Sequence, residues 1–253
     1  MSVIAIASLL ATQSVVTLSF QPKVGSSYKQ STTLAQTSTM GNSTTSMVMT
    51  TKILSFEGGY FKLENTPSNV TVSGGMGKND TAKKAMSKPT TIYLNKQYKP
   101  KSSGKDMSGI EQMMGGMSGA MSGFAFPNKP VKVGETWTTS FDMGQAMGAA
   151  AKGQPAAQGL KSAGKLNTTY KLLKADANTV TVGVTVGGTM NMDMAGGKGG
   201  GQGMKMSMVL SGSGTSTFER NTGIPISSSM KTSMQMAGMQ AFNMTMSMTS
   251  KRI

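Results

Sequence analysis

The sequence predicts a mainly β protein, an open antiparallel half-barrel of two related meanders with one or two short helices packed on or in it. Even positions between 166 and 248 are overwhelmingly apolar and odd positions mostly Thr, Ser, Asn, Lys or Gln. That period of two is typical of strands with one buried face. In addition, Lys23-Val24-Gly25-x-x-Tyr28-x-x-Ser31 matches Lys132-Val133-Gly134-x-x-Trp137-x-x-Ser140 position for position. We therefore expect one domain over residues 15–253, with half-repeats 15–100 and 130–253 joined by a helix and linker at 101–129.

Composition excludes several classes of function. The 253 residues have a formal net charge of +15, no cysteine, no histidine and 26 methionines. Disulfides, thiolate or imidazole catalysis and the common zinc sites are therefore excluded. Two Ser-x-x-Lys matches, at 26–29 and 102–105, lack the companion motifs of that nucleophile. We expect no enzyme activity and no cofactor.

Residues 1–14 contain a short apolar run that ends in small side chains. The run resembles the core and cleavage zone of a secretory signal peptide, and it is too short to span a bilayer. The positive charges that usually precede such a run are missing, so a buried first strand is the alternative. Export to the periplasm or the cell surface is the favoured expectation.

Residues 15–100 consist of extended segments. Val16, Leu18 and Phe20 alternate with polar neighbours, and Glu57-Gly58-Gly59 is a hairpin turn signal between strands at 46–56 and 60–65. A short strand is expected at 90–94, between two loops rich in glycine, lysine and serine.

The segment Lys78–Lys105 contains eight lysines and one acid. Such a run is usually a solvated face, and its functional interpretation is docking on anionic lipid or polysaccharide. Nucleic acid fits poorly, because arginines and stacking aromatics are missing.

The middle of the chain contains the expected helices and the second aromatic turn. Ser108-Gly-Ile-Glu111 fits a capping box, and Met113, Met117 and Met121 follow at helical spacing, although three glycines weaken this helix at 108–121. A weaker helix is expected at 145–152. Pro127 and Pro130 then precede a turn at Gly134 and a strand at 136–141. We expect Tyr28, Gly134 and Trp137 to be structural anchors, with Trp137 buried at one end of the barrel.

The last ninety residues predict a five-stranded meander with a defined register. A hairpin centred on Gly199 places Met190 opposite Met208 and Met192 opposite Met206 on one face. Asp193 then meets Lys205 on the other face. The glycine-rich loop at 196–203 lacks the Ser or Thr and the helix of a phosphate-binding loop, so we interpret it as a hairpin connection. Further turns are expected at 221–223 and 237–240.

Three interpretations of the methionines stay open. They can be a packed core, because thioethers fill irregular space. They can line an adaptable apolar pocket between the curved sheet and helix 108–121, formed by Met113, Met117, Met121, Met192, Met206, Met234 and Met246. They can also bind a soft metal such as Cu(I), although the usual accompanying His or Cys is missing.

Three motifs together resemble a family of exported bacterial proteins of unknown function. They are the early Lys23-Val24-Gly25-x-x-Tyr28, the mid-chain Pro127-x-x-Pro130-Val131-x-Val133-Gly134-x-x-Trp137 and the late Gly212-x-Gly-x-x-x-Phe218-Glu-x-x-x-Gly223-Ile-Pro225. Such proteins are similar in architecture to the LolA and LppX lipoprotein carriers, an open half-barrel curled over helices. The resemblance implies an envelope location and an apolar ligand, and it supplies no catalytic residue. Three features depart from that pattern: the missing positive charges before the apolar run, the high methionine content and the glycine-rich helix.

Overall fold

The computed structural model describes residues 15–39, 41–74, 83–84, 86–101, 124–142, 160–194, 204–238 and 242–253, without the side chains of 160–162, 193–194 and 204. The predicted signal segment and both predicted helices, 108–121 and 145–152, lie outside these residues. The account below concerns the described part of the chain.

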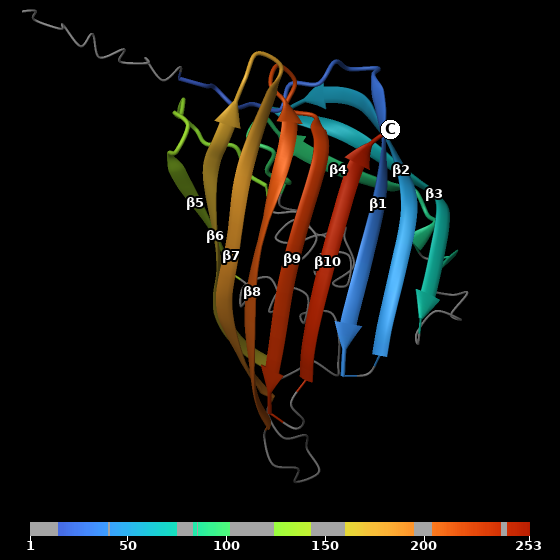
Figure 1. Cartoon of the computed structure of the whole chain (residues 1–253), viewed down its shortest axis with the longest axis vertical. Helices are drawn as coiled ribbons and strands as arrows, with labels where there is room; N and C mark the ends of the chain where they lie inside the picture. The colour runs from blue at the N-terminus through green and yellow to red at the C-terminus, as the bar shows by residue number, and fades with distance from the viewer. Residues whose placement is uncertain are drawn as a thin grey trace, which may run out of the picture.

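Ten antiparallel strands form one sheet, which curves into an open half-barrel (Figure 1). The sheet order is β4-β3-β2-β1-β10-β9-β8-β7-β6-β5, so the last strand pairs with the first and joins the two halves of the chain. The strands are β1 Ser27–Ser38, β2 Gly41–Glu57, β3 Tyr60–Gly74, β4 Thr90–Asn95, β5 Thr136–Asp142, β6 Leu160–Ala175, β7 Thr179–Met194, β8 Met204–Glu219, β9 Pro225–Ala237 and β10 Phe242–Arg252.

The predicted C-terminal meander is confirmed, register included. Strands β6 to β10 are consecutive neighbours. In the hairpin of β7 and β8, Met190 lies opposite Met208, Met192 opposite Met206 and Asp193 opposite Lys205. Met192 is buried, while Lys205 is exposed. The period of two therefore located both the strands and their buried face.

The N-terminal half agrees with the sequence except at its start. Gly58 and Gly59, with φ of 58° and 83°, form the turn between β2 and β3, and the predicted short strand is β4. The extended segment expected at Val16, Leu18 and Phe20 is not a paired strand of the sheet. All three side chains are buried, but the segment makes only an isolated bridge, from Val16 to Val131. It lies against the sheet as an extended cover, so its alternation reflects burial rather than strand pairing.

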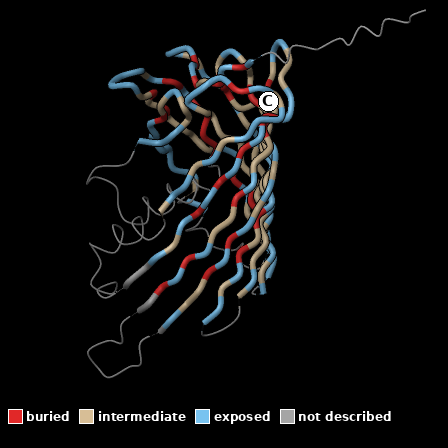
Figure 2. Tube along the Cα trace, turned by 90° about the vertical axis from the view of Figure 1, so that its left-hand side faces the viewer, coloured by how far each residue is buried: buried red, intermediate tan, exposed pale blue. Residues whose placement is uncertain are grey.

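Buried positions alternate with exposed ones along the strands (Figure 2), and those on the inner face form two separate clusters. We define the inner face as the one packed against residues 16–20 and 124–131. The aromatic cluster lies at the end of the sheet near the turn of β2 and β3. Its buried members are Val16, Leu18, Phe20, Ile53, Phe61, Leu63, Leu94, Phe124, Ala125, Phe126, Val131, Tyr170, Leu172, Val180, Val182, Phe218 and Ile224. The methionine cluster consists of Leu166, Val186, Met190, Met192, Met208, Leu210 and Met234, with Met206, Met230, Met236, Phe242 and Met244 packed against it.

The two matching motifs of the sequence adopt the same turn. Gly25 and Gly134 have φ of 85° and 92°. The N–H groups that follow them donate to Lys23 and Lys132, at 3.1 and 3.0 Å. Each glycine N–H then donates to a carbonyl of the next strand, that of Ile53 at 2.8 Å or Leu172 at 2.7 Å.

A bulge follows each of these two contacts. The register of β2 on β3 shifts between Ile53 and Ser55, and that of β6 on β7 shifts between Leu172 and Lys174. The two halves therefore share both the turn and the irregularity beside it.

Candidate ligand-binding face

Cross-strand pairing brings the methionines of four strands together on the inner face. Met208 of β8 lies opposite Met190 of β7 on one side and Met236 of β9 on the other. Two residues before Met236 on β9, Met234 lies opposite Met244 of β10. Residues directly opposite on one face have Cβ atoms about 4.5–5.5 Å apart, so these side chains form one continuous surface.

The structure unites part of the predicted ligand-binding set. Met192 and Met234 are buried members of the methionine cluster, and Met206 packs against them. Met246 lies one strand further, opposite Thr232 of β9 and Gln36 of β1, and is partly buried. The other three predicted residues, Met113, Met117 and Met121, lie outside the described residues. The part of the proposed pocket that they would form therefore stays a prediction.

Beyond Met246 the inner face becomes mixed. Met47 and Met49 on β2 lie opposite Thr32 and Gln30 of β1, and all four are partly buried. Four threonines at inner positions of the sheet are buried, namely Thr45, Thr51, Thr168 and Thr232. Among the described residues, no buried side-chain nitrogen or oxygen lacks a hydrogen-bond partner. This part of the face is therefore amphipathic, with its polar groups already satisfied.

Glycines mark the boundary between the two clusters on β8. A Cβ added at Gly212 would lie 2.5 Å from Cγ2 of Thr232, and one at Gly214 would lie 2.9 Å from Sδ of Met230. The side chains of Thr232 and Met230 on β9 therefore fill the space beside these two glycines. The boundary is closely packed, and the methionine cluster is set apart from the aromatic one.

Two tyrosine hydroxyls provide the interior polar contact beside the aromatic cluster. Tyr98 and Tyr28 are hydrogen-bonded to each other, and Tyr28 is also bonded to Thr51. Burial raises the pKa of both, that of Tyr98 well above its usual value of 10.0. Both are therefore neutral at physiological pH, and neither is suited to act as a general base.

The predicted anchors lie together at one end of the sheet, with one correction. Trp137 was expected to be buried, but it is only partly buried, because β5 is an edge strand of the sheet. Its indole N–H donates to the Ala125 carbonyl at 2.6 Å, and its ring stacks on Tyr170 with centroids 5.4 Å apart. Gly134 forms the turn before it, and Tyr28 packs against the same aromatic cluster. The role of anchor stays a prediction.

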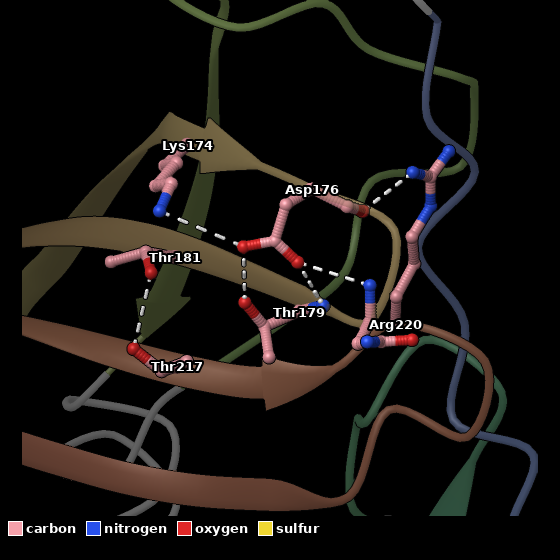
Figure 3. Close-up of polar contacts among 7 residues, drawn as sticks. Lys174, Asp176, Thr179, Thr181, Thr217 and Arg220 are labelled. Atoms are coloured by element: carbon pink, nitrogen blue, oxygen red, sulfur yellow. Dashed lines mark hydrogen bonds and ion pairs between the residues drawn. The ribbon is translucent and has the colours of Figure 1, made fainter.

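A concentration of polar contacts at the turn between β6 and β7 fixes that turn (Figure 3). The Asp176 carboxylate accepts hydrogen bonds from the backbone N–H groups of Asn178 and Thr179, at 3.0 and 2.7 Å, and from the Thr179 hydroxyl at 2.9 Å. The bonds from Thr179 are the main reason that the Asp176 pKa is lowered. Arg220 donates to the Asp176 carbonyl at 2.7 Å, which ties this turn to the end of β8. The carboxylate is saturated by local donors, as in an Asx turn, so it is not a candidate acid or base.

The aromatic cluster is the feature that sequence reasoning missed. Tyr98 contacts the rings of Phe20, Phe124, Phe126 and Phe218, at centroid distances of 4.9 to 6.3 Å. These rings come from four separate segments of the chain. The available signal was the motif Phe124-Ala-Phe126 before Pro127, where apolar residues stand beside a segment expected to be a loop.

Chemically, the described residues of the inner face offer apolar contact, neutral hydroxyls and the amides of Gln30 and Gln36. No group of three His, Cys, Asp or Glu that could hold a metal ion occurs among the described residues. In the same part of the chain, no helix is long and apolar enough to cross a membrane.

Comparison with known protein families gives a match. The model of a family of unknown function, DUF6263, matches residues 80–225, which is more than half of the chain. The matched segment includes β4 to β8 and the turn to β9, and with them most of the methionine cluster. No curated protein matches the sequence.

Proposed function

The chain belongs to the DUF6263 family, whose function is unknown, and we propose that it is a non-enzymatic protein of the bacterial envelope that binds an apolar or lipid-like molecule at its methionine cluster. The likeness to the LolA and LppX carriers is part of this proposal. The curved antiparallel sheet with an apolar inner face supports it.

The observation on which the proposal rests is the segregation of the methionines. Among the residues that the structure describes, the aromatic cluster contains none, either among its buried members or among those packed against it. Of the twelve residues named for the methionine cluster, eight are methionines. A general bias of composition would place methionine in both clusters, so the thioethers have a role specific to this part of the inner face.

That role follows from the flexibility of the side chain. Methionine is unbranched and polarisable, and it adapts its shape to an irregular or varied partner. The aromatic cluster, with its edge-to-face rings and branched aliphatics, already gives the fold a rigid core. The methionine cluster is therefore free to serve as the deformable surface against which an acyl chain packs.

A structural role is the alternative, and a specific observation favours it. Met190 and Met192 are 3% and 7% exposed, as expected for a packed core. Soft-metal binding is the third interpretation, suggested by the directly opposed thioethers of Met192 and Met206.

Titration with a fluorescent fatty acyl probe separates the first two interpretations. The informative variant is Met206→Gln with Met236→Gln, because both residues are only partly buried and the fold should tolerate an amide there. The matched control is Val209→Gln, since Val209 is 44% exposed at an alternate position of the same strand. An amide placed against an acyl chain costs about 1–3 kcal/mol, so the double variant should bind roughly tenfold more weakly or worse.

The control should bind as the native protein does. Circular dichroism of all three proteins verifies that the fold is intact. If the folded native protein shows no saturable binding, the methionines form a packed core and the structural interpretation holds.

A further inference from the structure

A second surface lies at the β4 edge of the sheet, away from the methionine cluster (Figure 1). Lysine ammonium groups there lie over aromatic rings. Lys101 Nζ is 5.5 Å from the centroid of Tyr60 and 5.8 Å from that of Tyr93, and Lys96 Nζ is 5.8 Å from that of Phe56. We call this surface the Tyr60–Tyr93 edge, and it consists of Phe56, Tyr60, Lys62, Tyr93, Lys96, Lys99 and Lys101.

Strand pairing places most of these side chains on the outer face. Phe61 and Leu94 lie opposite each other and are buried in the aromatic cluster. Lys62 and Tyr93 are the next opposed pair, so they point to the other side of the sheet. Residues 99–101 return beside β4, where the Lys101 N–H donates to the Tyr93 carbonyl at 2.9 Å.

The turn before this return is held rigidly. The side-chain oxygen of Asn95 accepts hydrogen bonds from the N–H groups of Gln97 and Lys99, at 3.0 and 2.9 Å. Lys96 and Lys99 therefore project from a fixed turn, and their positions relative to Tyr93 are set by the backbone.

Charge on this side of the sheet is strongly unbalanced. Between Lys52 and Lys101 the described residues include eight lysines and two glutamates, Glu57 and Glu64. Neither ion pair found among the described residues involves any of these lysines. Apolar side chains are also exposed at this edge. Leu54, at the β2 bulge, is 42% exposed, and Phe56 at 42% and Ile92 at 36% lie on the inner face, opposite Phe61 and Leu63.

The ring contacts distinguish between anionic partners. A sugar or a nucleobase that binds an aromatic residue stacks on an open ring face. Here the ammonium group of Lys96 lies over one face of Phe56, and that of Lys101 lies over one face each of Tyr60 and Tyr93. A lipid headgroup region requires no open ring face, because tyrosine lies there with its hydroxyl in water and its ring among headgroups. Exposed leucine and phenylalanine side chains add apolar contact with the acyl boundary.

We propose that the Tyr60–Tyr93 edge docks the protein on an anionic lipid bilayer, with Lys96, Lys99 and Lys101 facing the phosphates. This surface is separate from the proposed ligand-binding face, and its test does not depend on ligand binding. The combination of fixed lysines, rings that face ammonium groups and exposed apolar side chains at one edge of the sheet supports the proposal.

Co-sedimentation with vesicles tests it. The vesicles contain either phosphatidylcholine alone or equal amounts of phosphatidylcholine and phosphatidylglycerol. The edge variant replaces Lys96, Lys99 and Lys101 with glutamine. The matched control replaces Lys171, Lys231 and Lys251, which are exposed on β6, β9 and β10, so that both variants lose the same net charge.

The native protein and the control should bind the mixed vesicles and not the neutral ones. The edge variant should bind the mixed vesicles on the order of hundredfold more weakly, because each of the three lysines contributes about fivefold to binding at an anionic surface. Equal weakening of both variants would show that net charge alone is responsible and would overturn the proposal.

Two further results bear on the partner class. The variant Tyr93→Trp places a tryptophan in the edge, in addition to the native Trp137. If brominated acyl chains quench the fluorescence of this variant but not that of the native protein, contact between the edge and the bilayer is supported. The native protein could instead bind soluble dextran sulfate and not the mixed vesicles, with the dextran sulfate binding lost in the edge variant. That result would assign the surface to a soluble polyanion and overturn the proposal.

Discussion

Replacing Gly134 with alanine should destabilise the fold through the backbone alone. Its φ is 92°, in the region that side chains with a Cβ rarely adopt, and a Cβ built there meets no heavy atom within 4 Å. Gly25, the matching residue of the first half, has φ of 85° and equally open surroundings. The two substitutions therefore isolate the conformational cost of the turn from any steric clash.

The magnitude follows from two opposing contributions. Left-handed backbone costs an alanine roughly 1–2 kcal/mol relative to glycine. Alanine also restricts the unfolded chain, and this offsets about 0.4–1 kcal/mol of the loss in unfolding free energy. We expect each variant to lose about 1 kcal/mol of unfolding free energy. The double variant should lose about the sum, because the two turns donate to different strands, β2 and β6.

Urea denaturation followed by circular dichroism measures these changes. Gly188→Ala is the steric comparison, because a Cβ there would lie 2.2 Å from the Lys165 carbonyl oxygen and Gly188 has no positive φ. That variant should lose more than either turn variant, since the β6–β7 backbones must move apart. The reasoning is refuted if one turn glycine tolerates alanine without loss while the other loses several kcal/mol, because the two turns would then not be equivalent.

Three further predictions concern particular side chains. Trp137→Phe should lose about 1–2 kcal/mol of unfolding free energy in urea, because the Ala125 carbonyl is left without the indole donor, and no loss would mean that water replaces it. The unfolding free energy of the native protein should fall above about pH 10, and Tyr98→Phe should make this fall smaller, as measured by urea melts at increasing pH. The Tyr98 pKa is raised in the folded protein, so stability is complete below the ordinary tyrosine pKa and is lost as pH rises beyond it; an unchanged pH profile would contradict this. Titration with Cu(I) against a competing chelator should show no stoichiometric uptake. Uptake that is abolished by replacing both Met192 and Met206 with leucine would favour the metal interpretation, because these near-isosteric changes preserve the fold.

The register of β7 on β8 could be predicted because sequence fixes it locally. Met192 and Met206 are close in the chain, the loop between them is rich in glycine, and a slip of one residue would turn every methionine to solvent. The turn at Gly134 could be predicted for a similar reason, since the positive φ of a glycine needs only its nearest neighbours.

The aromatic cluster could not be predicted in this way. Phe20, Tyr98, Phe126 and Phe218 lie far apart in the sequence, and no periodicity relates them. They meet because β1 pairs with β10, a long-range contact that brings the two halves into one sheet. The partial exposure of Trp137 has the same origin, since only the strand order shows that β5 is an edge.

Native mass spectrometry of protein purified from its own host tests the central proposal most directly, because it detects a bound molecule without a choice of probe. The native protein and Val209→Gln should each retain an adduct in the mass range of a lipid or fatty acid. The variant with Met206→Gln and Met236→Gln should be detected at the mass of the protein without an adduct. A native protein that is folded and appears only at the bare mass would contradict the proposal, and so would an adduct that the double variant retains in full.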